Sequence, residues 1–179
     1  MSLVEIGSRY NSDKGYLHSY YEVYDLHFRR LKDSAKNLLE IGTYAGESLL
    51  VWKEYFSNCN IYGVDNYFKP KFKSQDRITF NLLDAYCDES VTKLSRNYDI
   101  IIDDGPHTLE SQLFFVEKYL PLLSNNGIMV IEDILSLDSA LRIAEAFPED
   151  LRRFVFSIDR RVVPGVDYSS VMIVFDRYE

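Results

Sequence analysis

The chain has 179 residues, of which 46% are hydrophobic and 27% are charged, as expected for one compact domain with a buried core. This composition disfavours a disordered or multidomain chain. Acidic residues outnumber basic residues by 28 to 20, which gives a net charge of -8, so the field of the molecule repels polyanions and nucleic acid is not an expected partner.

The N-terminal segment differs from the rest of the chain, and we expect a helical arm over residues 1–36 and one domain over residues 37–179. The second half of Tyr10–Arg30 has a helical period with one aromatic face. It is interpreted as a lid, as core packing or as an interface of a homo-oligomer. The start MSLVEIGSRY lacks the features of a secretory signal, and the two cysteines, Cys59 and Cys87, form no metal-binding pattern, so a cytoplasmic location is expected. The apolar runs are too short to cross a membrane.

From residue 38 onward, short apolar runs alternate with segments of helical period. The expected strands are Leu38–Ile41, Ile61–Val64, Ile78–Leu82, Tyr98–Ile102, Ile128–Ile131, Phe154–Ile158 and Val171–Phe175. The expected helices are Gly46–Phe56, Asp88–Leu94, Thr108–Leu123 and Ser136–Phe147. We expect the third of these helices to end through a left-handed residue in Asn125-Asn126-Gly127.

The alternation of strands and helices predicts an α/β fold with a doubly wound, seven-stranded, mostly parallel sheet of Rossmann-like type. The last two strands are separated by about a dozen residues with Pro164-Gly165 between them, which predicts an antiparallel hairpin at the sheet edge. Ligands of such folds bind beyond the carboxyl ends of the strands, so the residues that follow each strand are the candidates for a site.

The first strand leads into a helix through Gly42-Thr43-Tyr44-Ala45-Gly46. Gly42 permits a tight turn and the close approach of a ligand, and Gly46 permits close packing of the helix. Tyr44 stands where a dinucleotide-binding loop needs a second glycine, so a nucleoside without phosphates fits better. An ordinary strand-to-helix turn is the alternative.

Carboxylates end the next two strands. Asp65 is placed to accept the two hydroxyls of a ribose, and Asp84 is placed near an adenine amino group. Either carboxylate has the alternative role of a turn or helix cap.

The residues that follow the fourth and fifth strands give the strongest indication of a catalytic or metal-binding site. Asp103, Asp104 and His107 follow one strand, Glu132 and Asp133 follow the other, and the two strands are expected to be neighbours. Four converging carboxylates suit Mg²⁺ or Mn²⁺, and the imidazole is placed as a general base. The alternative is a buried Asp103, an Asp104 that caps the following helix, and a solvated acidic pair after the fifth strand.

These motifs resemble the class I S-adenosylmethionine-dependent methyltransferases through Glu40–Gly46, Asp65 and the expected strand order. Within that superfamily, Asp103–His107, Ile131–Asp133 and the N-terminal Ser12–Gly15 look like the metal-dependent sugar O-methyltransferases of macrolide biosynthesis, of macrocin and mycinamicin type, with cephalosporin-hydroxylase-like proteins as further relatives. Pro106 stands where that group usually has serine.

The resemblance implies an S-adenosylmethionine-dependent and metal-dependent O-methyltransferase. It assigns the divalent ion to Asp104, Glu132 and Asp133, and gives His107 the role of base. Cofactor contacts are expected from Glu40, Gly42, Thr43, Gly46, Asp65, Asp84, Asp103, Lys14 and Tyr20. Asp13 and His18 in the arm are expected to help close the pocket.

The acceptor is left open by the sequence. A sugar hydroxyl on a natural product, a nucleotide sugar or a polysaccharide is the first expectation. A small phenolic or catechol-like acceptor and a non-catalytic cofactor-binding module are the alternatives. A basic stretch, Lys69, Lys71, Lys73 and Arg77, is interpreted as a solvated loop or a phosphate contact.

Overall fold

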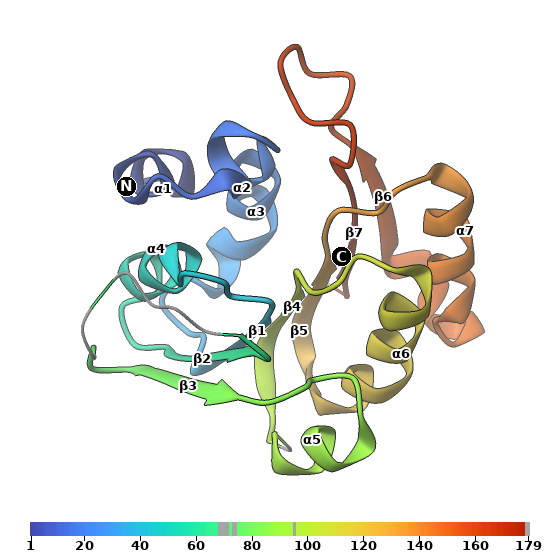
Figure 1. The fold of residues 1–179 in the computed structure, drawn as a ribbon, viewed down its shortest axis with the longest axis horizontal. Coiled ribbons are helices and arrows are strands. Elements are labelled where there is room, and N and C mark those ends of the chain that lie inside the picture. Colours follow the sequence, from blue (N-terminus) through green and yellow to red (C-terminus); the bar gives the residue numbers. More distant parts are fainter. Residues whose placement is uncertain (68–71, 73–74, 95, 178–179) are drawn as a thin grey trace.

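A computed structural model describes residues 1–67, 72, 75–94 and 96–177. Its centre is a seven-stranded sheet in the order β3-β2-β1-β4-β5-β7-β6 (Figure 1). The strands are β1 (Asn37–Ile41), β2 (Asn60–Asp65), β3 (Ile78–Leu82), β4 (Tyr98–Asp103), β5 (Leu123–Ile131), β6 (Val155–Asp159) and β7 (Val171–Asp176). The first five pair in parallel, whereas β7 is antiparallel to both β5 and β6. The predicted doubly wound sheet with a terminal hairpin is therefore confirmed.

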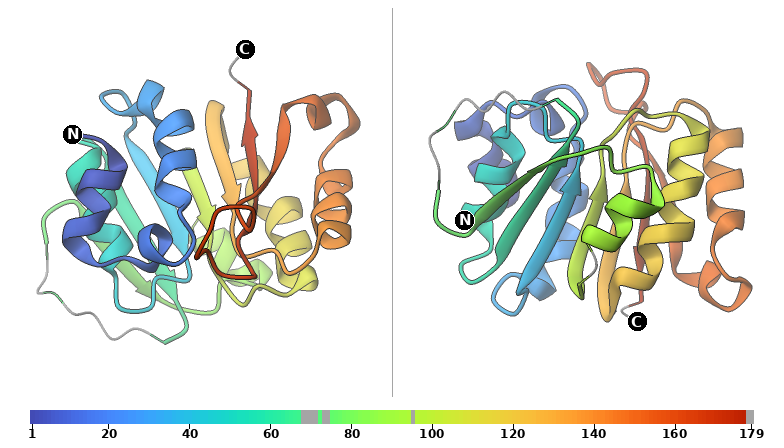
Figure 2. Two further views of the ribbon diagram at one scale, coloured as in Figure 1. Left: turned by 90° about the horizontal axis from the view of Figure 1, so that it is seen from above. Right: turned by 60° about the horizontal axis from the view of Figure 1, so that its bottom comes forward.

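Helices cover both faces of this sheet (Figure 2). They are α1 (Leu3–Tyr10), α2 (Asp13–Tyr16), α3 (Tyr20–Phe28), α4 (Glu47–Tyr55), α5 (Asp88–Lys93), α6 (Leu109–Tyr119) and α7 (Leu137–Ala146), with 3-10 turns at Arg29–Leu31, Leu120–Leu122 and Glu149–Phe154. The arm helices and α4 pack on one face, and α5, α6 and α7 pack on the other, because alternate residues of each strand point to opposite faces. No helix in these described ranges is long and apolar enough to span a bilayer.

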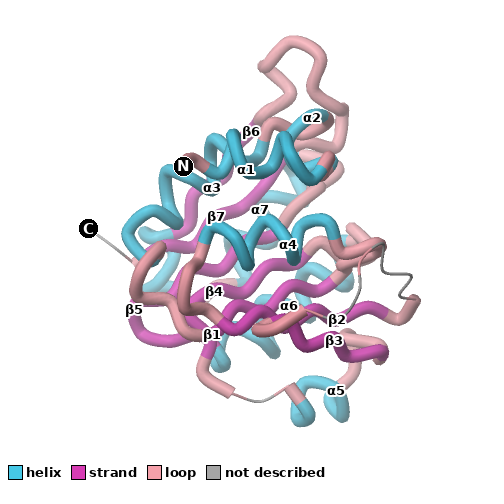
Figure 3. The backbone as a smooth tube through the Cα atoms, turned by 90° about the vertical axis from the view of Figure 1, so that its left-hand side faces the viewer, coloured by secondary structure: helices cyan, strands magenta, loops and turns pink. Residues whose placement is uncertain are grey.

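The arm is built into the core. α1 lies beside α4 (Figure 3). The aromatic face predicted for the arm belongs to α3 and is buried against α4. The buried rings of α3, including Tyr24 and Phe28, surround Trp52 of α4. The loop between β6 and β7 also contacts the arm, where the Asp167 N–H donates to the carbonyl of Leu17 (2.9 Å). The core-packing interpretation of the arm is thus confirmed.

The end of α6 differs from the expectation. The helix closes in the 3-10 turn Leu120–Leu122, and β5 already begins at Leu123. Asn125, Asn126 and Gly127 are extended strand residues, so the predicted left-handed ending is wrong. Pro121 has no N–H to continue the helix, and a Cβ on Gly127 would meet the Leu123 side chain at 2.7 Å. Of the basic stretch, Lys69, Lys71 and Lys73 lie outside the described residues.

Candidate active site

The carboxyl ends of β1, β4 and β5 meet where the strand order reverses. The N–H of Asp104 donates to the carbonyl of Ile41 (2.8 Å), and the N–H of Glu132 donates to that of Asp103 (2.9 Å). These bonds extend the parallel ladder and bring Asp104, Glu132 and Asp133 to one edge of the sheet. Glu132 and Asp133 are 1% and 8% exposed, so the alternative of a solvated acidic pair is wrong.

Lys14 of α2 lies among these carboxylates. Its Nζ is 2.5 Å from Asp104 Oδ2, 2.8 Å from Glu132 Oε2 and 3.3 Å from Glu40 Oε1. The lysine side chain is 2% exposed. Burial acts to lower its pKa, but the three carboxylates outweigh burial and raise the pKa well above its ordinary value. Lys14 is therefore a buried ammonium ion, and it lies with the acids rather than against the large cavity described below.

Two tyrosines of α3 bind the carboxylates after β5. The Tyr24 hydroxyl donates to Glu132 Oε1, and the Tyr20 hydroxyl donates to Asp133 Oδ1 (2.8 Å). Tyr20 and Tyr24 are one helical turn apart, so their hydroxyls reach neighbouring residues of the sheet edge. Burial raises the pKa of Glu132 well above its ordinary value and also raises the pKa of Asp133.

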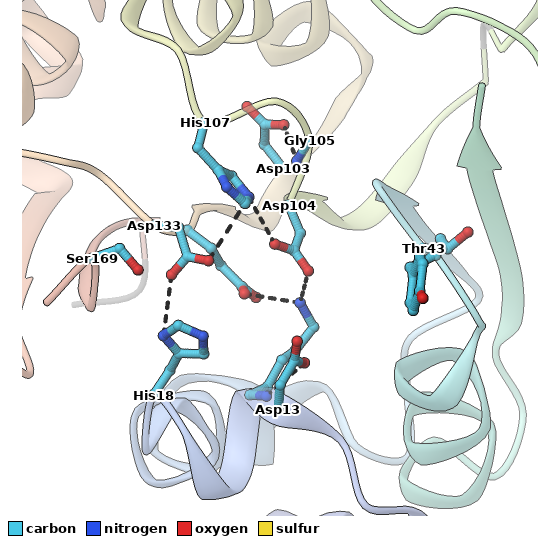
Figure 4. Close-up of polar contacts among 12 residues, drawn as sticks. Asp13, His18, Thr43, Asp103, Asp104, Gly105, His107, Asp133 and Ser169 are labelled. Carbon is cyan, nitrogen blue, oxygen red and sulfur yellow. Dashed lines mark hydrogen bonds and ion pairs between the residues drawn. The ribbon is translucent and has the colours of Figure 1, made fainter. Parts of the chain in front are cut away.

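Asp104, His107 and Asp133 form a second cluster, which shares Asp104 with the Lys14 contacts (Figure 4). His107 Nε2 is 3.1 Å from Asp104 Oδ1 and 3.8 Å from Asp133 Oδ2. One ligand atom from each residue lies within 4.8 Å of the others. Burial acts to lower the pKa of His107, but its hydrogen bond to Asp104 and the nearby carboxylates raise it. His18 Nδ1 lies 3.3 Å from Asp133 Oδ1 on the far side.

A cavity of about 750 Å³ opens beside this cluster, along the carboxyl ends of the parallel strands. It is lined by Asp104, His107 and Asp133 and by three residues predicted to bind cofactor, namely Gly42, Asp65 and Asp84. Gly42 has a φ of +79°, and a Cβ there would meet the carbonyl oxygen of Asp104 at 1.8 Å. The glycine predicted at this turn is therefore needed for the close approach of the loops after β1 and β4.

Backbone donors occupy the two carboxylates that were expected to bind a nucleoside. Asp65 Oδ2 accepts the N–H groups of Thr43 (2.9 Å) and Tyr44 (2.7 Å). Asp84 Oδ1 accepts the N–H of Tyr86 (2.9 Å). Each acid thus holds a turn in place, as the alternative of a turn cap supposed, and each also lines the cavity.

The other predicted cofactor residues do not line the large cavity. Glu40 is fully buried, and its Oε2 accepts from Ser48 Oγ (2.8 Å) and Trp52 Nε1 (3.0 Å) of α4. Gly46 has a left-handed φ at the start of α4, and Thr43, in the loop that precedes it, is buried. Lys14 and Tyr20 lie with the carboxylates as described above.

Asp103 is also buried, as one alternative supposed. Its Oδ1 accepts from the Tyr86 hydroxyl and from the N–H of Gly105 (3.2 Å), and burial raises its pKa to about 7. Asp104 does not cap α6, because Thr108 is the N-cap of that helix and accepts from the Ser111 N–H. Sequence reasoning gave no role to Tyr24, Tyr86 or Ser170, whose hydroxyls bind Glu132, Asp103 and His18. The spacing of Tyr20 and Tyr24 is the one sequence signal that indicates the first of these contacts.

The sequence matches the family described as "Methyltransferase domain" over residues 39–134. It is 36% identical over 143 residues to demethylmacrocin O-methyltransferase of Streptomyces fradiae, which covers 74% of this chain and 36% of that protein. The chain belongs to the methyltransferase domain family. Mycinamicin VI 2''-O-methyltransferase of Micromonospora griseorubida is 34% identical, with the same coverage of both chains.

Solved structures agree with this assignment. The methyltransferase domain superposes on the MycE methyltransferase in complex with Mg, SAH and mycinamycin VI with a TM-score of 0.76 and 25% identity, over 98% of this chain and 54% of that one. The predicted relationship to macrolide sugar O-methyltransferases and the class I methyltransferase fold are confirmed. The chain spans about a third of the length of the two curated relatives named above.

Proposed function

We propose that this chain is an S-adenosylmethionine-dependent and divalent-metal-dependent O-methyltransferase that transfers a methyl group to a hydroxyl of a sugar. The observation that supports this proposal is the cluster Asp104–His107–Asp133 at the wall of the large cavity. The cluster combines oxygen ligands for a hard cation with an imidazole that can accept a proton. The 3'-O-methyltransferase of a rhamnosyl tetracenomycin C from Streptomyces olivaceus, 33% identical over 145 residues, and the two relatives named above support a saccharide acceptor on a small natural product.

The cavity is large enough for a small-molecule cofactor such as S-adenosylmethionine. Its volume of about 750 Å³ falls within the roughly 300–1,000 Å³ of small-molecule sites. Gly42 lines the cavity at the switch point of the sheet, where α/β folds bind their ligands. We propose that Gly42, Asp65 and Asp84 contact S-adenosylmethionine, and that Glu40, Thr43, Gly46 and Asp103 maintain the loops around it.

The donor set also fits Mg²⁺ or Mn²⁺. The predicted ligands are Asp104, Glu132 and Asp133, and the fit is direct for the two aspartates, which line the cavity. Glu132 is bound instead to Lys14 and Tyr24 in this structure. When bound, the ion would supply a positive charge that stabilises the acceptor oxygen as its proton leaves.

His107 is the proposed base. An acceptor hydroxyl would give its proton to Nδ1 of His107, the ring nitrogen that does not bind Asp104, while the hydroxyl oxygen takes up the methyl group. When bound, S-adenosylmethionine would supply the methyl group and would leave as S-adenosylhomocysteine, and His107 would hold the proton of the acceptor hydroxyl. Asp104 orients the ring through the 3.1 Å contact to Nε2, so the walls of the cavity supply both alignment and proton removal.

Calorimetric titration with S-adenosylmethionine, with and without Mg²⁺, tests the cofactor assignment, and methyl transfer to methyl rhamnoside and to catechol tests the acceptor class. We expect Asp104→Asn to reduce turnover at least about 100-fold while cofactor affinity changes less than about threefold. Asp138→Asn, at an exposed carboxylate of α7, is the matched control. A folded protein that binds no S-adenosylmethionine would contradict the proposal, and turnover of catechol alone would replace the sugar with a phenol.

A further inference from the structure

The turn after β4 carries the proposed base. His107 lies at the end of the turn Asp103–His107, between β4 and α6, and has a left-handed φ of 58°. Its side chain lines the large cavity. Because a residue with a Cβ seldom adopts this conformation, the surroundings of the turn must hold it in place.

Tyr86, in the segment after β3, makes one of the contacts that hold the turn. Its hydroxyl donates to Asp103 Oδ1, the same oxygen that accepts the N–H of Gly105 (3.2 Å). Asp103 is 2% exposed, so these protein donors take the place of water at that oxygen. The tyrosine hydroxyl and the backbone of the turn are therefore joined through one buried atom.

Gly105 also lies directly against the tyrosine. A Cβ at this position would be 1.9 Å from Tyr86 Oη and 2.8 Å from Tyr86 Cζ. Gly105 has no left-handed φ, so its backbone conformation is open to other residues. The side chain of Tyr86, and not the backbone conformation, thus excludes a larger residue from the turn.

Tyr86 is itself held by groups outside the turn. Its N–H donates to Asp84 Oδ1 (2.9 Å), and the Tyr119 hydroxyl donates to the carbonyl of Ala85 (2.7 Å). Its ring packs edge-on against Phe114 of α6, with the ring centroids 6.2 Å apart. A hydroxyl with this support can fix the turn after β4 rather than follow its movements.

We propose that Tyr86 is a positioning residue, which acts through Asp103 and Gly105 to set the direction in which His107 faces the cavity. The inference deepens the proposed function and rests on it for the role of His107 as base. Tyr86 takes no part in the transfer of the proton or of the methyl group. Its hydroxyl joins the segment after β3, where Asp84 is proposed to contact the cofactor, to the turn that carries the base.

Nuclear magnetic resonance of the histidine rings tests this role in the full chain, in EDTA and without cofactor. The chain has three histidines, so the ring signals of ¹³C-labelled histidine can be followed separately, and His107→Gln assigns the signal of His107. Tyr86→Phe keeps the ring and removes only the hydroxyl. We expect it to move the His107 signal and to leave those of His18 and His27 in place. An unmoved His107 signal would overturn the proposal.

Tyr98→Phe is the matched control. Tyr98 is a buried tyrosine at the other end of β4, and its hydroxyl donates to the carbonyl of Leu94 (2.9 Å). Each of the two variants loses one hydrogen bond, so we expect similar small falls in their melting temperatures. Tyr98→Phe should leave all three histidine signals in place. A His107 signal that moved equally in both variants would show a general effect of lost stability and would overturn the proposal.

Kinetics separate positioning from a merely structural role. We expect Tyr86→Phe to reduce kcat for methyl transfer to methyl rhamnoside at least about tenfold, while the dissociation constant of S-adenosylmethionine changes less than about threefold. Tyr98→Phe should retain the kcat of the wild type. A kcat of Tyr86→Phe within about threefold of wild type, or an equal loss of cofactor affinity, would overturn the proposal.

The contact itself is tested by a double variant. Gly105→Ala places a Cβ against Tyr86 Oη, so we expect its melting temperature to fall. The double variant Tyr86→Phe/Gly105→Ala lacks that oxygen and should melt at a higher temperature than Gly105→Ala alone. If it melted no higher, the proposal would be wrong. A wild-type protein that methylates neither methyl rhamnoside nor catechol would instead contradict the proposed function, and the histidine signals would still decide whether Tyr86 positions His107.

Discussion

Three of the six described non-glycine residues that have a left-handed φ lie at the proposed site. Tyr44, His107 and Asp133 have left-handed φ values of 42°, 58° and 51°, which residues with a Cβ seldom adopt. All three line the cavity. Such conformations cost about 1–3 kcal/mol each and persist where the surroundings enforce them. Here they turn the chain sharply after β1, β4 and β5, and so aim His107 and Asp133 at one point.

Gly42 offers the sharpest stability test at this scale. Gly42→Ala places a Cβ 1.8 Å from the carbonyl oxygen of Asp104, so we expect a loss of about 3 kcal/mol or more in the free energy of unfolding measured in urea. Gly165→Ala is the matched control, because Gly165 has a similar φ of +82° but no atom within 4 Å of its Cβ position. That change should cost only about 1 kcal/mol. Similar losses at both positions would show that φ alone, and not the close approach, requires Gly42.

The two cysteines should differ in reactivity. Cys59 is fully buried, and burial raises its pKa to about 12, so the thiol stays protonated at neutral pH. Cys87 is partly exposed. We expect iodoacetamide at pH 8 to modify one thiol in the native protein and two in denaturant, as counted by mass spectrometry. Modification of native Cys59 in a Cys87→Ser variant would contradict the buried environment.

The sequence indicated which residues of the strand ends carry chemistry but not how all of them pair. Asp104 and His107 are near neighbours in the chain, so their contact follows from one tight turn. Lys14 and Tyr20 were expected to contact the cofactor, yet they bind carboxylates that lie 90 and 113 residues away in the sequence. Pairings across such a distance depend on how the arm packs against the sheet, which local periodicity does not determine.

At the scale of elements, α3 connects the core to the site. One face of the helix carries Tyr20 and Tyr24, whose hydroxyls bind the acids after β5. The same helix buries Phe28 against Trp52 and Phe56. Packing of this aromatic face therefore fixes the position of α3 along the sheet, and with it the position of the two hydroxyls relative to the carboxylates.

Truncation of Phe28 measures that packing. The side chain is fully buried, so Phe28→Ala should reduce the free energy of unfolding by about 3–5 kcal/mol in urea. Leu26→Ala on the same helix is the control, because Leu26 is 57% exposed and should change stability by less than about 0.5 kcal/mol. Equal effects would mean that α3 does not depend on its aromatic face.

The strands of the sheet could be predicted because each of them is marked by its own short segment of the sequence. The buried strands appear as short apolar runs, and the observed strands extend them by a few residues at most, except β5. There, polar residues at positions 124–126 concealed the first half of the strand, which pairs with β4 across a register shift near Tyr98. Within the predicted helical arm, the separate helices α1 and α2 were not predicted, and α2 spans only four residues, too few to show a helical period.

For the molecule as a whole, the net charge of -8 discriminates between classes of acceptor. Two solved structures of similar fold are named as a ribosomal RNA methyltransferase and a pre-rRNA processing protein, but the likeness to them extends to the fold alone. We expect a labelled RNA oligonucleotide to show no binding tighter than about 100 μM at 150 mM salt in fluorescence anisotropy, because the field repels phosphates. The same titration at 50 mM salt is the control. Binding that strengthens steeply at low salt would reveal a basic surface strong enough to overcome the net charge.

The fluorescence of the single tryptophan of the chain can report on the buried ion pair of Lys14 and Glu40. Trp52 donates through Nε1 to Glu40, whose other oxygen faces Lys14, and three aromatic rings of α3 enclose the indole. Any change in charge between Glu40 and Lys14 alters the electric field along that indole N–H. The emission wavelength of the native protein should therefore report on the buried ion pair directly, without a label and in real time.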